Sequence, residues 1–457
     1  MRSLLGLIFI VSSGAAVALA CGVTAAVDGA ATADGGSSGS PTVAPDGGGS
    51  NGLPCDVDAI LNTACRKCHA ATPLYGAPMP LVTFADLHNP AATNAARKVF
   101  ELIPERVNDD AKPMPEAPNA RLSAADRATL AAWVANGAPA GTAQCNTTPV
   151  TPDGPTTTCK PDLPIGPATT YTMPTATGDE YVCYGVELTR PTPTHVVGFA
   201  PRIDNKAIVH HVVLFEADQP YSTTPTPCNA GGSLQWRMVT GWAPGGKGFE
   251  LPPQAGFPLK TTGATHYVVQ MHYSNPQALI DQKDTSGFDL CTSAPRQYEA
   301  DVMAFGTQKI DINVGETKSL DCLVPVKTKI AGYDLDFTGL HLISSMPHMH
   351  ILGTEMSTQL LAGGPSGAPT DLGTITGWSF NTQAWLPILG DGTGAGAVLK
   401  ANDMIKTRCT WKNTSGKPVK FGEKTADEMC YSFTTYYPRI NAPFWSWAAP
   451  ALTSTCQ

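Results

Sequence analysis

The residues of this sequence that are best suited to chemistry are histidines gathered in three short groups. Ten histidines occur, and five of them lie in apolar, strand-like surroundings: His210, His211, His272, His348 and His350. Neutral imidazole binds copper, zinc and iron alike, so these histidines predict transition-metal sites without naming the metal. A zinc hydrolase is the main alternative, but the chain has no His-Glu-x-x-His motif and no acid beside the histidines to serve as a base.

Backbone geometry treats the two close histidine pairs differently. Residues two apart on a strand share a face, so His348 and His350 can bind one ion together. Adjacent residues point to opposite faces, so His210 and His211 can share an ion only at a strand end or at a bulge. Without such an irregularity, the adjacent pair is a structural coincidence.

A second motif, Cys65-Arg66-Lys67-Cys68-His69, has the spacing at which c-type haem is attached, with His69 as an iron ligand. A redox dithiol beside an unrelated histidine is the alternative. The stretch 55–140 resembles small cytochromes c, and this resemblance implies that Met114, ahead of the last helix, is the second axial ligand. Met79, which lies between two prolines, competes for that role, and either methionine can instead fill space in a core.

The elements around this motif are predicted to form a small helical unit over 55–145. Apolar residues recur at helical spacing within 123–136; Ser123 is suited to cap that helix, and Gly137 to end it. A Thr- and Pro-rich linker follows over 146–158.

From residue 159 onward the pattern changes to short alternating apolar runs separated by Gly, Pro and Asn. Examples are 208–215, 266–272 and 398–410. This pattern is typical of β-sandwiches, and about 300 residues is long for one sandwich. We therefore expect a mainly β chain with two antiparallel β-sandwich domains, 159–305 and 306–457, preceded by the small all-α unit.

The N-terminal residues predict export. Residues 1–21 resemble a lipoprotein signal peptide that ends at Cys21, with ordinary cleavage near Ala20 as the alternative. Residues 22–54 are rich in Gly, Ser and Asp and predict a disordered tether. Cys21, Cys65 and Cys68 leave ten of the 13 cysteines, an even number that suits five disulfides in an oxidising compartment. A lipid-anchored protein of the bacterial outer membrane, the periplasm or the cell surface is expected.

Composition excludes one class of partner. The formal net charge of −8 leaves no basic surplus to neutralise phosphates, so a nucleic-acid partner is not expected. No apolar stretch after the signal approaches the roughly 20 residues that span a bilayer.

The three histidine groups, followed by the segment 428–439 with Met429 beside Cys430, resemble the copper type II, ascorbate-dependent monooxygenases. The resemblance covers roughly 159–457. It implies a first copper, for electron transfer, on His210, His211 and His272, and a second, catalytic copper that activates O2 on His348, His350 and Met429. A thioether favours Cu(I), whereas zinc rarely binds methionine. The family fold is two packed jelly-roll-like sandwiches, one copper on each.

The same resemblance implies how the ten cysteines pair. Cys409 with Cys430 and Cys183 with Cys228 match family disulfides, and the remaining pairs then follow as Cys159–Cys291, Cys322–Cys456 and Cys55–Cys145. Counting alone cannot choose among the possible pairings.

Departures from the family pattern concern the substrate. The peptide-amidating branch has an arginine where this chain has Met346, and polar substrate contacts where it has Tyr431 and Phe433. A peptidylglycine substrate is therefore not expected, and the pocket is predicted to be more apolar or aromatic. Three further polar residues are candidates to orient a polar group of the substrate: Tyr436, Tyr437 and Arg439.

These features together predict a monooxygenase with two copper ions that hydroxylates a C–H bond of a small organic substrate with O2. Electrons are expected from the fused c-type haem, from ascorbate or from a redox partner protein. A non-catalytic surface lipoprotein that handles copper or electrons is the alternative hypothesis.

Overall fold

The computed structural model describes residues 51–457 except 111–112, 117–118, 144, 146–156, 175–178, 229–234, 245, 276–277, 381–382, 391–395 and 423–425. The predicted signal peptide, the lipid attachment at Cys21, the tether up to residue 50 and most of the linker 146–158 lie outside the described residues. No helix in the described ranges is long and apolar enough to cross a membrane.

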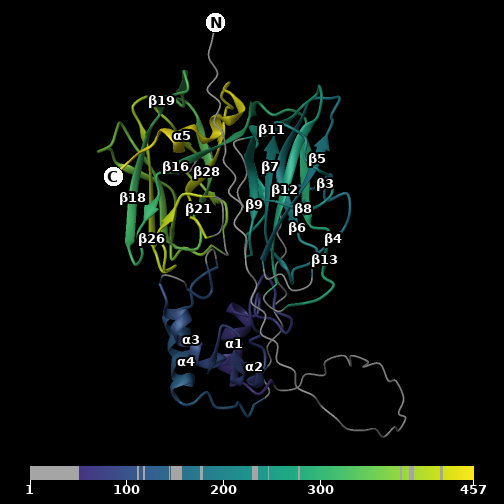
Figure 1. Cartoon of the computed structure of the whole chain (residues 1–457), viewed down its shortest axis with the longest axis vertical. Coiled ribbons are helices and arrows are strands. Elements are labelled where there is room, and N and C mark those ends of the chain that lie inside the picture. Colours follow the sequence, from purple (N-terminus) through teal and green to yellow (C-terminus); the bar gives the residue numbers. More distant parts are fainter. Residues whose placement is uncertain are drawn as a thin grey trace, which may run out of the picture. The chain divides into compact units, whose positions relative to one another are not determined.

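The first described part of the chain is helical (Figure 1). It contains α1 (Cys55–Ala64), α2 (Phe84–His88), α3 (Val99–Asn108) and α4 (Ala124–Ala135), with a small hairpin of β1 (Pro90–Ala91) and β2 (Asn94–Lys98). Leucines from three of these helices, Leu61, Leu87 and Leu130, are buried in one core. The predicted helix over 123–136 is confirmed as α4, where Ser123 accepts a hydrogen bond from the amide of Asp126.

Two sheets follow and share one hydrophobic core, with Phe199 and Leu290 from one sheet beside Val212 and Val268 from the other. One sheet holds β3 (Leu163–Ile165), β6 (Thr194–Arg202), β10 (Phe249–Glu250), β11 (Ala255–Leu259), β14 (Gly287–Ser293) and β15 (Tyr298–Glu299). The other holds β5 (Asp179–Leu188), β7 (Val209–Ala217), β8 (Thr226–Pro227), β9 (Trp236–Trp242) and β12 (Thr265–Ser274). β4 (Tyr171–Thr172) and β13 (Lys283–Asp284) form a separate, short antiparallel pair.

A second pair of sheets also shares one core, with Phe305 and Leu342 from one sheet and Val324 and Ile405 from the other. One sheet holds β16 (Asp301–Thr307), β21 (His341–His348), β24 (Leu386–Pro387), β25 (Ala397–Val398) and β28 (Cys430–Tyr437). The other holds β18 (Thr317–Pro325), β22 (Gly353–Leu361), β23 (Pro369–Thr376), β26 (Met404–Lys412) and β29 (Thr455–Cys456). The remaining elements are β17 (Asp311–Ile312) with β27 (Val419–Lys420), β19 (Lys327–Ile330) with β20 (Tyr333–Asp336), a 3₁₀ helix (Phe444–Ala448) and α5 (Ala449–Thr453).

The prediction of a mainly β chain is therefore confirmed, and the paired sheets fit the expected sandwiches. All strand pairings within these four sheets are antiparallel except that of β11 with β15. The chain changes from the first pair of sheets to the second at Ala300, between β15 and β16, shortly before the predicted boundary at residues 305 and 306.

The predicted strand runs 208–215 and 266–272 correspond to β7 and β12, but the run 398–410 is not one strand. It divides into the end of β25 and most of β26, with a turn between them. The carboxylate of Asp403 accepts hydrogen bonds from the amides of Lys400 and Gly363, and this local bonding competes with continued strand pairing. Alternation alone did not reveal the turn.

All five predicted disulfides are confirmed: Cys55–Cys145, Cys159–Cys291, Cys183–Cys228, Cys322–Cys456 and Cys409–Cys430. Cys65 and Cys68 are free.

Candidate metal centres

The first candidate centre forms where β7 and β12 pair. His211 lies opposite His272, but Tyr273 lies opposite Val209, so His210 is the extra residue of a β-bulge. This is the irregularity that an adjacent histidine pair needs to turn both imidazoles to one side. The Nδ1 atoms of His210 and His211 are 3.3 Å apart.

His272 completes a triangle of nitrogens. Its Nδ1 lies 3.1 Å from that of His210 and 3.3 Å from that of His211. The centre of such a triangle is about 1.9 Å from each corner, close to a metal–imidazole bond of about 2.0 Å. Three ring nitrogens cannot all hydrogen-bond to one another, whereas one cation can satisfy all three lone pairs. The donor set therefore fits a metal ion such as copper.

The surroundings keep His211 neutral and hold the ring of His272 in place. Burial is the main reason that the pKa of His211 lies well below its usual range, and the neighbouring imidazoles of His272 and His210 lower it further. Neutral imidazole is the form that binds a metal. Tyr181 of β5 stacks on His272 with ring centroids 4.3 Å apart, which restricts rotation of that ring.

The second candidate centre lies at the end of β21. The Nδ1 of His348 donates a hydrogen bond to Oε1 of Gln383 (2.6 Å), and the Nδ1 of His350 donates to the carbonyl of Asp427 (3.1 Å). Both bonds place the proton on Nδ1, so Nε2 is the nitrogen that would bind a metal. Burial lowers the pKa of His348, which favours the same neutral form. Met429, directly before β28, borders the same cavity as the two histidines.

Glu428 holds the second centre together, and sequence reasoning assigned it no role. Its fully buried carboxylate accepts hydrogen bonds from the amides of His350 (3.0 Å), Leu352 (2.7 Å) and Met429 (3.3 Å) and from the indole of Trp411 (2.9 Å). Burial raises its pKa to about 7, although these four donors act in the opposite direction. The only signal in the sequence was an acidic residue directly before a methionine and an apolar strand.

Both centres border one cavity of about 160 Å³. His211 reaches it from the first centre, and His348, His350 and Met429 reach it from the second. Apolar and aromatic side chains form much of its remaining wall, including Trp236, Met238, Met346, Tyr431, Phe433 and Trp447. The hydroxyl of Tyr431 accepts a hydrogen bond from Gln308 (2.7 Å), which supplies one polar contact within the wall.

One aromatic ring lies close to the histidines of both centres. The ring centroid of Phe380 is 6.4 Å from His210, 6.1 Å from His211 and 6.3 Å from His272, and 5.8 Å from His350. Phe380 therefore contributes to the apolar lining that the two centres share.

Three predicted substrate contacts lie away from this cavity. Tyr437 stacks on His341, and its hydroxyl accepts a hydrogen bond from Gln254 (2.8 Å). Arg439 pairs with the buried Asp301 (3.4 Å), and Tyr436 is buried in the core of the second pair of sheets. None of the three lines the cavity between the centres: Tyr436 and Tyr437 of β28 and Arg439 just after it make packing and ion-pair contacts instead.

The Cys-x-x-Cys-His motif lines a separate cavity of about 600 Å³, within the range of cofactor pockets. Cys65, Cys68 and His69 share its wall with both candidate methionines, Met79 and Met114. The Nδ1 of His69 donates to the carbonyl of Met79 (2.7 Å), so its Nε2 is free to bind iron. The residues present therefore fit a covalently attached haem.

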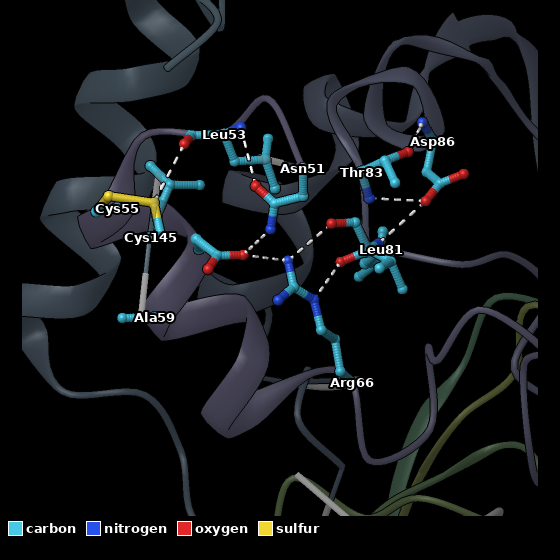
Figure 2. Close-up of polar contacts among 12 residues, drawn as sticks. Asn51, Leu53, Cys55, Ala59, Arg66, Leu81, Thr83, Asp86 and Cys145 are labelled. Carbon is cyan, nitrogen blue, oxygen red and sulfur yellow. Dashed lines mark hydrogen bonds and ion pairs between the residues drawn. A yellow bond between two sulfur atoms is a disulfide. The ribbon is translucent and has the colours of Figure 1, made fainter. Parts of the chain in front are cut away.

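Arg66, inside the motif, anchors this loop to its neighbours. Figure 2 shows its guanidinium reaching the backbone at Leu81. The Nε atom donates a hydrogen bond to the carbonyl of Leu81 (2.9 Å), and Nη2 donates to the carbonyl of Val82 (3.0 Å). The guanidinium also pairs with the fully buried carboxylate of Asp58 in α1 (2.7 Å). The motif is thus tied to both α1 and the loop before α2.

Comparison with known proteins adds an independent line of evidence. The family model described as copper type II ascorbate-dependent monooxygenase, N-terminal domain, matches residues 167–279, and the C-terminal domain model matches residues 298–449. These two stretches contain all six histidine and methionine side chains of the two candidate centres.

Several curated proteins are similar over the same region. Dopamine beta-hydroxylase of Bos taurus is 27% identical over 308 residues, 61% of this chain and 49% of that protein. MOXD1 homolog 1 of Drosophila melanogaster is 27% identical over 57% of this chain and 40% of that protein. DBH-like monooxygenase protein 1 of Homo sapiens is 26% identical over 54% and 42%, respectively. The chain thus spans about half the length of the curated relatives it matches, or somewhat less.

Among solved structures, one of infectious bursal disease virus superposes with a TM-score of 0.12 at 9% identity, over 63% of this chain and 77% of that chain. A likeness this weak carries no argument. The two family models together match more than half of the chain, in the expected order. The chain belongs to the copper type II, ascorbate-dependent monooxygenase family.

Proposed function

We propose that this chain is a monooxygenase that uses two copper ions and O2 to hydroxylate a C–H bond of a small organic substrate. The observation that carries the proposal is that the three-histidine centre and the His348, His350 and Met429 centre border one largely apolar cavity. Copper at the two centres would supply the two electrons that one such oxidation needs, one from each. The soft thioether of Met429 suits Cu(I).

The chain's own residues set the conditions for this chemistry. Gln383 and the carbonyl of Asp427 hold the two imidazoles of the second centre with Nε2 available. Glu428 fixes the backbone on both sides of the centre, at His350 and at Met429. The apolar wall limits the water that reaches a reactive oxidant, which protects the reaction from side paths.

The lining favours a small apolar or aromatic substrate. Met346, Tyr431 and Phe433, which replace the polar substrate contacts of the peptide-amidating branch, all border the cavity. They offer no positive charge to pair with a carboxylate. The Tyr431–Gln308 pair is the polar group best placed to orient a hydroxyl or amine of the substrate.

We further propose that the helical unit carries a c-type haem on Cys65 and Cys68, with His69 and Met114 as axial ligands. Met114 is preferred to Met79 because the Met79 backbone is already bonded to the Nδ1 edge of His69, away from the nitrogen that faces iron. The amide of Met114 donates to the carbonyl of Arg106 at the end of α3, which holds its loop at the cavity. A His/Met pair suits electron transfer.

The experiment for the copper proposal compares wild-type protein with Met429→Ile. We expect two copper ions per chain and an O2-dependent product from a panel of small aromatic and apolar compounds. Met429→Ile should lose the product while copper at the three-histidine centre remains. Met404→Ile, a methionine of β26 outside the cavity, is the matched control. Copper binding without product across the whole panel would favour a non-catalytic copper-handling protein instead.

The experiment for the haem is separate. Protein produced with a haem-attachment system should keep its haem absorbance after denaturation, because thioether bonds survive unfolding. Cys65→Ala/Cys68→Ala should lose it.

We also propose that the protein is exported, that it carries a lipid on Cys21 and that it has an external redox partner. Lipid attachment is tested by fatty-acid labelling of wild-type and Cys21→Ala protein.

A further inference from the structure

We infer that electrons enter the copper pair through His210, which the Tyr75–Gly76 turn holds against the haem cavity. This inference rests on the proposed function, because it takes both the haem and the copper as bound. Electrons would pass from the haem to the three-histidine centre before they reach the second centre. His210 would border the haem cavity and also bind copper.

The first observation is that one cavity joins the two sites. The cavity that Cys65, Cys68 and His69 line is also bordered by His210 and by Ser274, at the end of β12. Among the residues that border it, His210 is the only proposed copper ligand. The ligands of the second centre, His348, His350 and Met429, border the other cavity instead.

The orientation of His210 explains how it can serve both sites. Its Nδ1 is directed at the nitrogen triangle with His211 and His272. Its Cδ2 lies on the opposite edge of the ring, and a methyl group placed on Gly76 would lie 3.4 Å from that atom. One edge of the imidazole therefore meets the copper position, and the other meets the backbone of the haem-binding unit.

Specific contacts hold the haem-binding unit in this position. The amide of Tyr75 donates to the carbonyl of Lys206 (2.8 Å), just before β7. The Tyr75 ring packs edge-on against Trp242 with centroids 5.7 Å apart. Gly76 has a φ of +75°, and a side chain there would also meet Oγ of Ser274 at 3.3 Å. Glycine suits this position because of its positive φ, and the Cβ position lies within van der Waals range of His210.

The proposed step is a one-electron transfer with no bond made or broken in the protein. The haem iron passes from Fe(II) to Fe(III), and copper at the three-histidine centre passes from Cu(II) to Cu(I). Ascorbate or another external one-electron donor then reduces the haem again. Because donor and acceptor are in one chain, the transfer is intramolecular and its rate is independent of protein concentration.

The test uses a pair of glycine variants of the full chain. Gly76→Leu puts a side chain between the turn and His210. Gly137→Leu is the matched control, because Gly137 also has a positive φ, of +81°, but has open space around it. Both variants put a leucine at a positive φ, so they differ chiefly in what the new side chain meets: His210 and Ser274 at residue 76, and open space at residue 137.

Haem content after denaturation and the Cu(II) EPR signal are measured first for each variant. Missing haem or missing copper in the wild-type protein at this stage refutes the proposed function rather than the route. The haem is then reduced anaerobically by a flash-generated flavin semiquinone, and its reoxidation is followed together with loss of the Cu(II) signal.

We expect first-order reoxidation in wild-type and Gly137→Leu protein. In Gly76→Leu we expect it to be slower, because the rate of electron transfer falls steeply as the distance between donor and acceptor grows. An unchanged rate in loaded Gly76→Leu, or a wild-type rate proportional to protein concentration, overturns the inference. If Gly76→Leu does not fold, Tyr75→Ala, which removes the contact with Trp242, decides by the same criteria.

Discussion

At the scale of single residues, histidine presents a different ring nitrogen to each of the two candidate centres. The imidazoles of His210, His211 and His272 converge through Nδ1, whereas His348 and His350 donate through Nδ1 and would bind a metal through Nε2. The difference arises from the neighbours, since a carbonyl acceptor near one ring nitrogen assigns the proton to it. Residue type alone predicts a ligand but not the ligating atom.

Among residues that are not proposed copper ligands, we expect substitution of Glu428 to have the largest effect on stability and on copper binding. Glu428→Ala removes the acceptor for four buried donors, and each orphaned donor costs about 1–3 kcal/mol. We expect the free energy of unfolding to fall by at least about 3 kcal/mol, and copper binding at the second centre to weaken while the first centre is unaffected. Denaturant unfolding and copper titration measure both. Glu355→Ala, an exposed glutamate of β22, is the control; equal effects of the two variants would contradict the prediction.

The ionisation of Glu428 also predicts a pH dependence in the copper-free protein. Burial raises its pKa to about 7, above the 4.5 of an exposed glutamate. Between these values the folded chain binds the proton more tightly than the unfolded chain, so the free energy of unfolding decreases as pH rises from about 4.5 to about 7. Glu428→Gln cannot titrate and should lack this part of the slope. If wild type and Glu428→Gln showed the same dependence of unfolding free energy on pH, Glu428 would not be the titrating group.

At the scale of elements, local irregularities position the ligands. The bulge in β7 turns His210 and His211 to one side, and His350, two residues after the end of β21, lies with its ring centroid 5.3 Å from that of His348. The disulfide Cys409–Cys430 joins β26 to β28 directly beside Met429. In the helical unit, the buried Arg66–Asp58 pair holds the Cys-x-x-Cys-His motif against α1.

Arg66→Met tests that role. The substitution leaves the carboxylate of Asp58 buried without its cation, and breaking a buried pair in this way costs about 3–5 kcal/mol. We expect the helical unit to unfold at lower denaturant concentration and the yield of attached haem to drop. Arg97→Met breaks an exposed pair with Glu105 and should cost at most about 1 kcal/mol. Circular dichroism at helix wavelengths and haem content report the outcome, and similar losses in both variants would argue against a special role for Arg66.

At the scale of the whole molecule, function depends on segments that are far apart in sequence. The cavity between the centres takes residues from β7, β9, β21 and β28, and the cavity at the Cys-x-x-Cys-His motif joins Cys65, Cys68 and His69 to residues 210 and 274. Metal binding and folding are therefore coupled, since the unfolded chain has neither set of ligands assembled.

Copper should accordingly stabilise the folded chain in two increments. Free Cu(I) at about 100 times the Kd of a site adds about 2.7 kcal/mol to the free energy of unfolding for that site. Met429→Ile should keep the increment of the three-histidine centre and lose most of the other, while Met404→Ile should behave as wild type. Anaerobic denaturant unfolding at buffered Cu(I) measures this. If Met429→Ile kept the full stabilisation by the second copper ion, that ion would bind at a site without Met429.

Features that depend on near neighbours or on residue type could be predicted from the amino-acid sequence. Periodicity predicted α4, β7 and β12, the ordered histidine groups predicted the family, and similarity to that family predicted all five disulfides. The sequence also showed that the adjacent pair His210 and His211 needs an irregular strand.

Features that depend on strand register and on packing between distant segments became visible in the folded chain alone. The tertiary structure placed Glu428 under the second centre, removed Tyr436, Tyr437 and Arg439 from the cavity, and split the run 398–410 with a turn at Asp403. It also set Gly76 against His210. Spacing along the chain constrains residues within one element, whereas the meeting of residues 76, 210 and 272 is decided by how sheets and helices pack, and no local pattern encodes that.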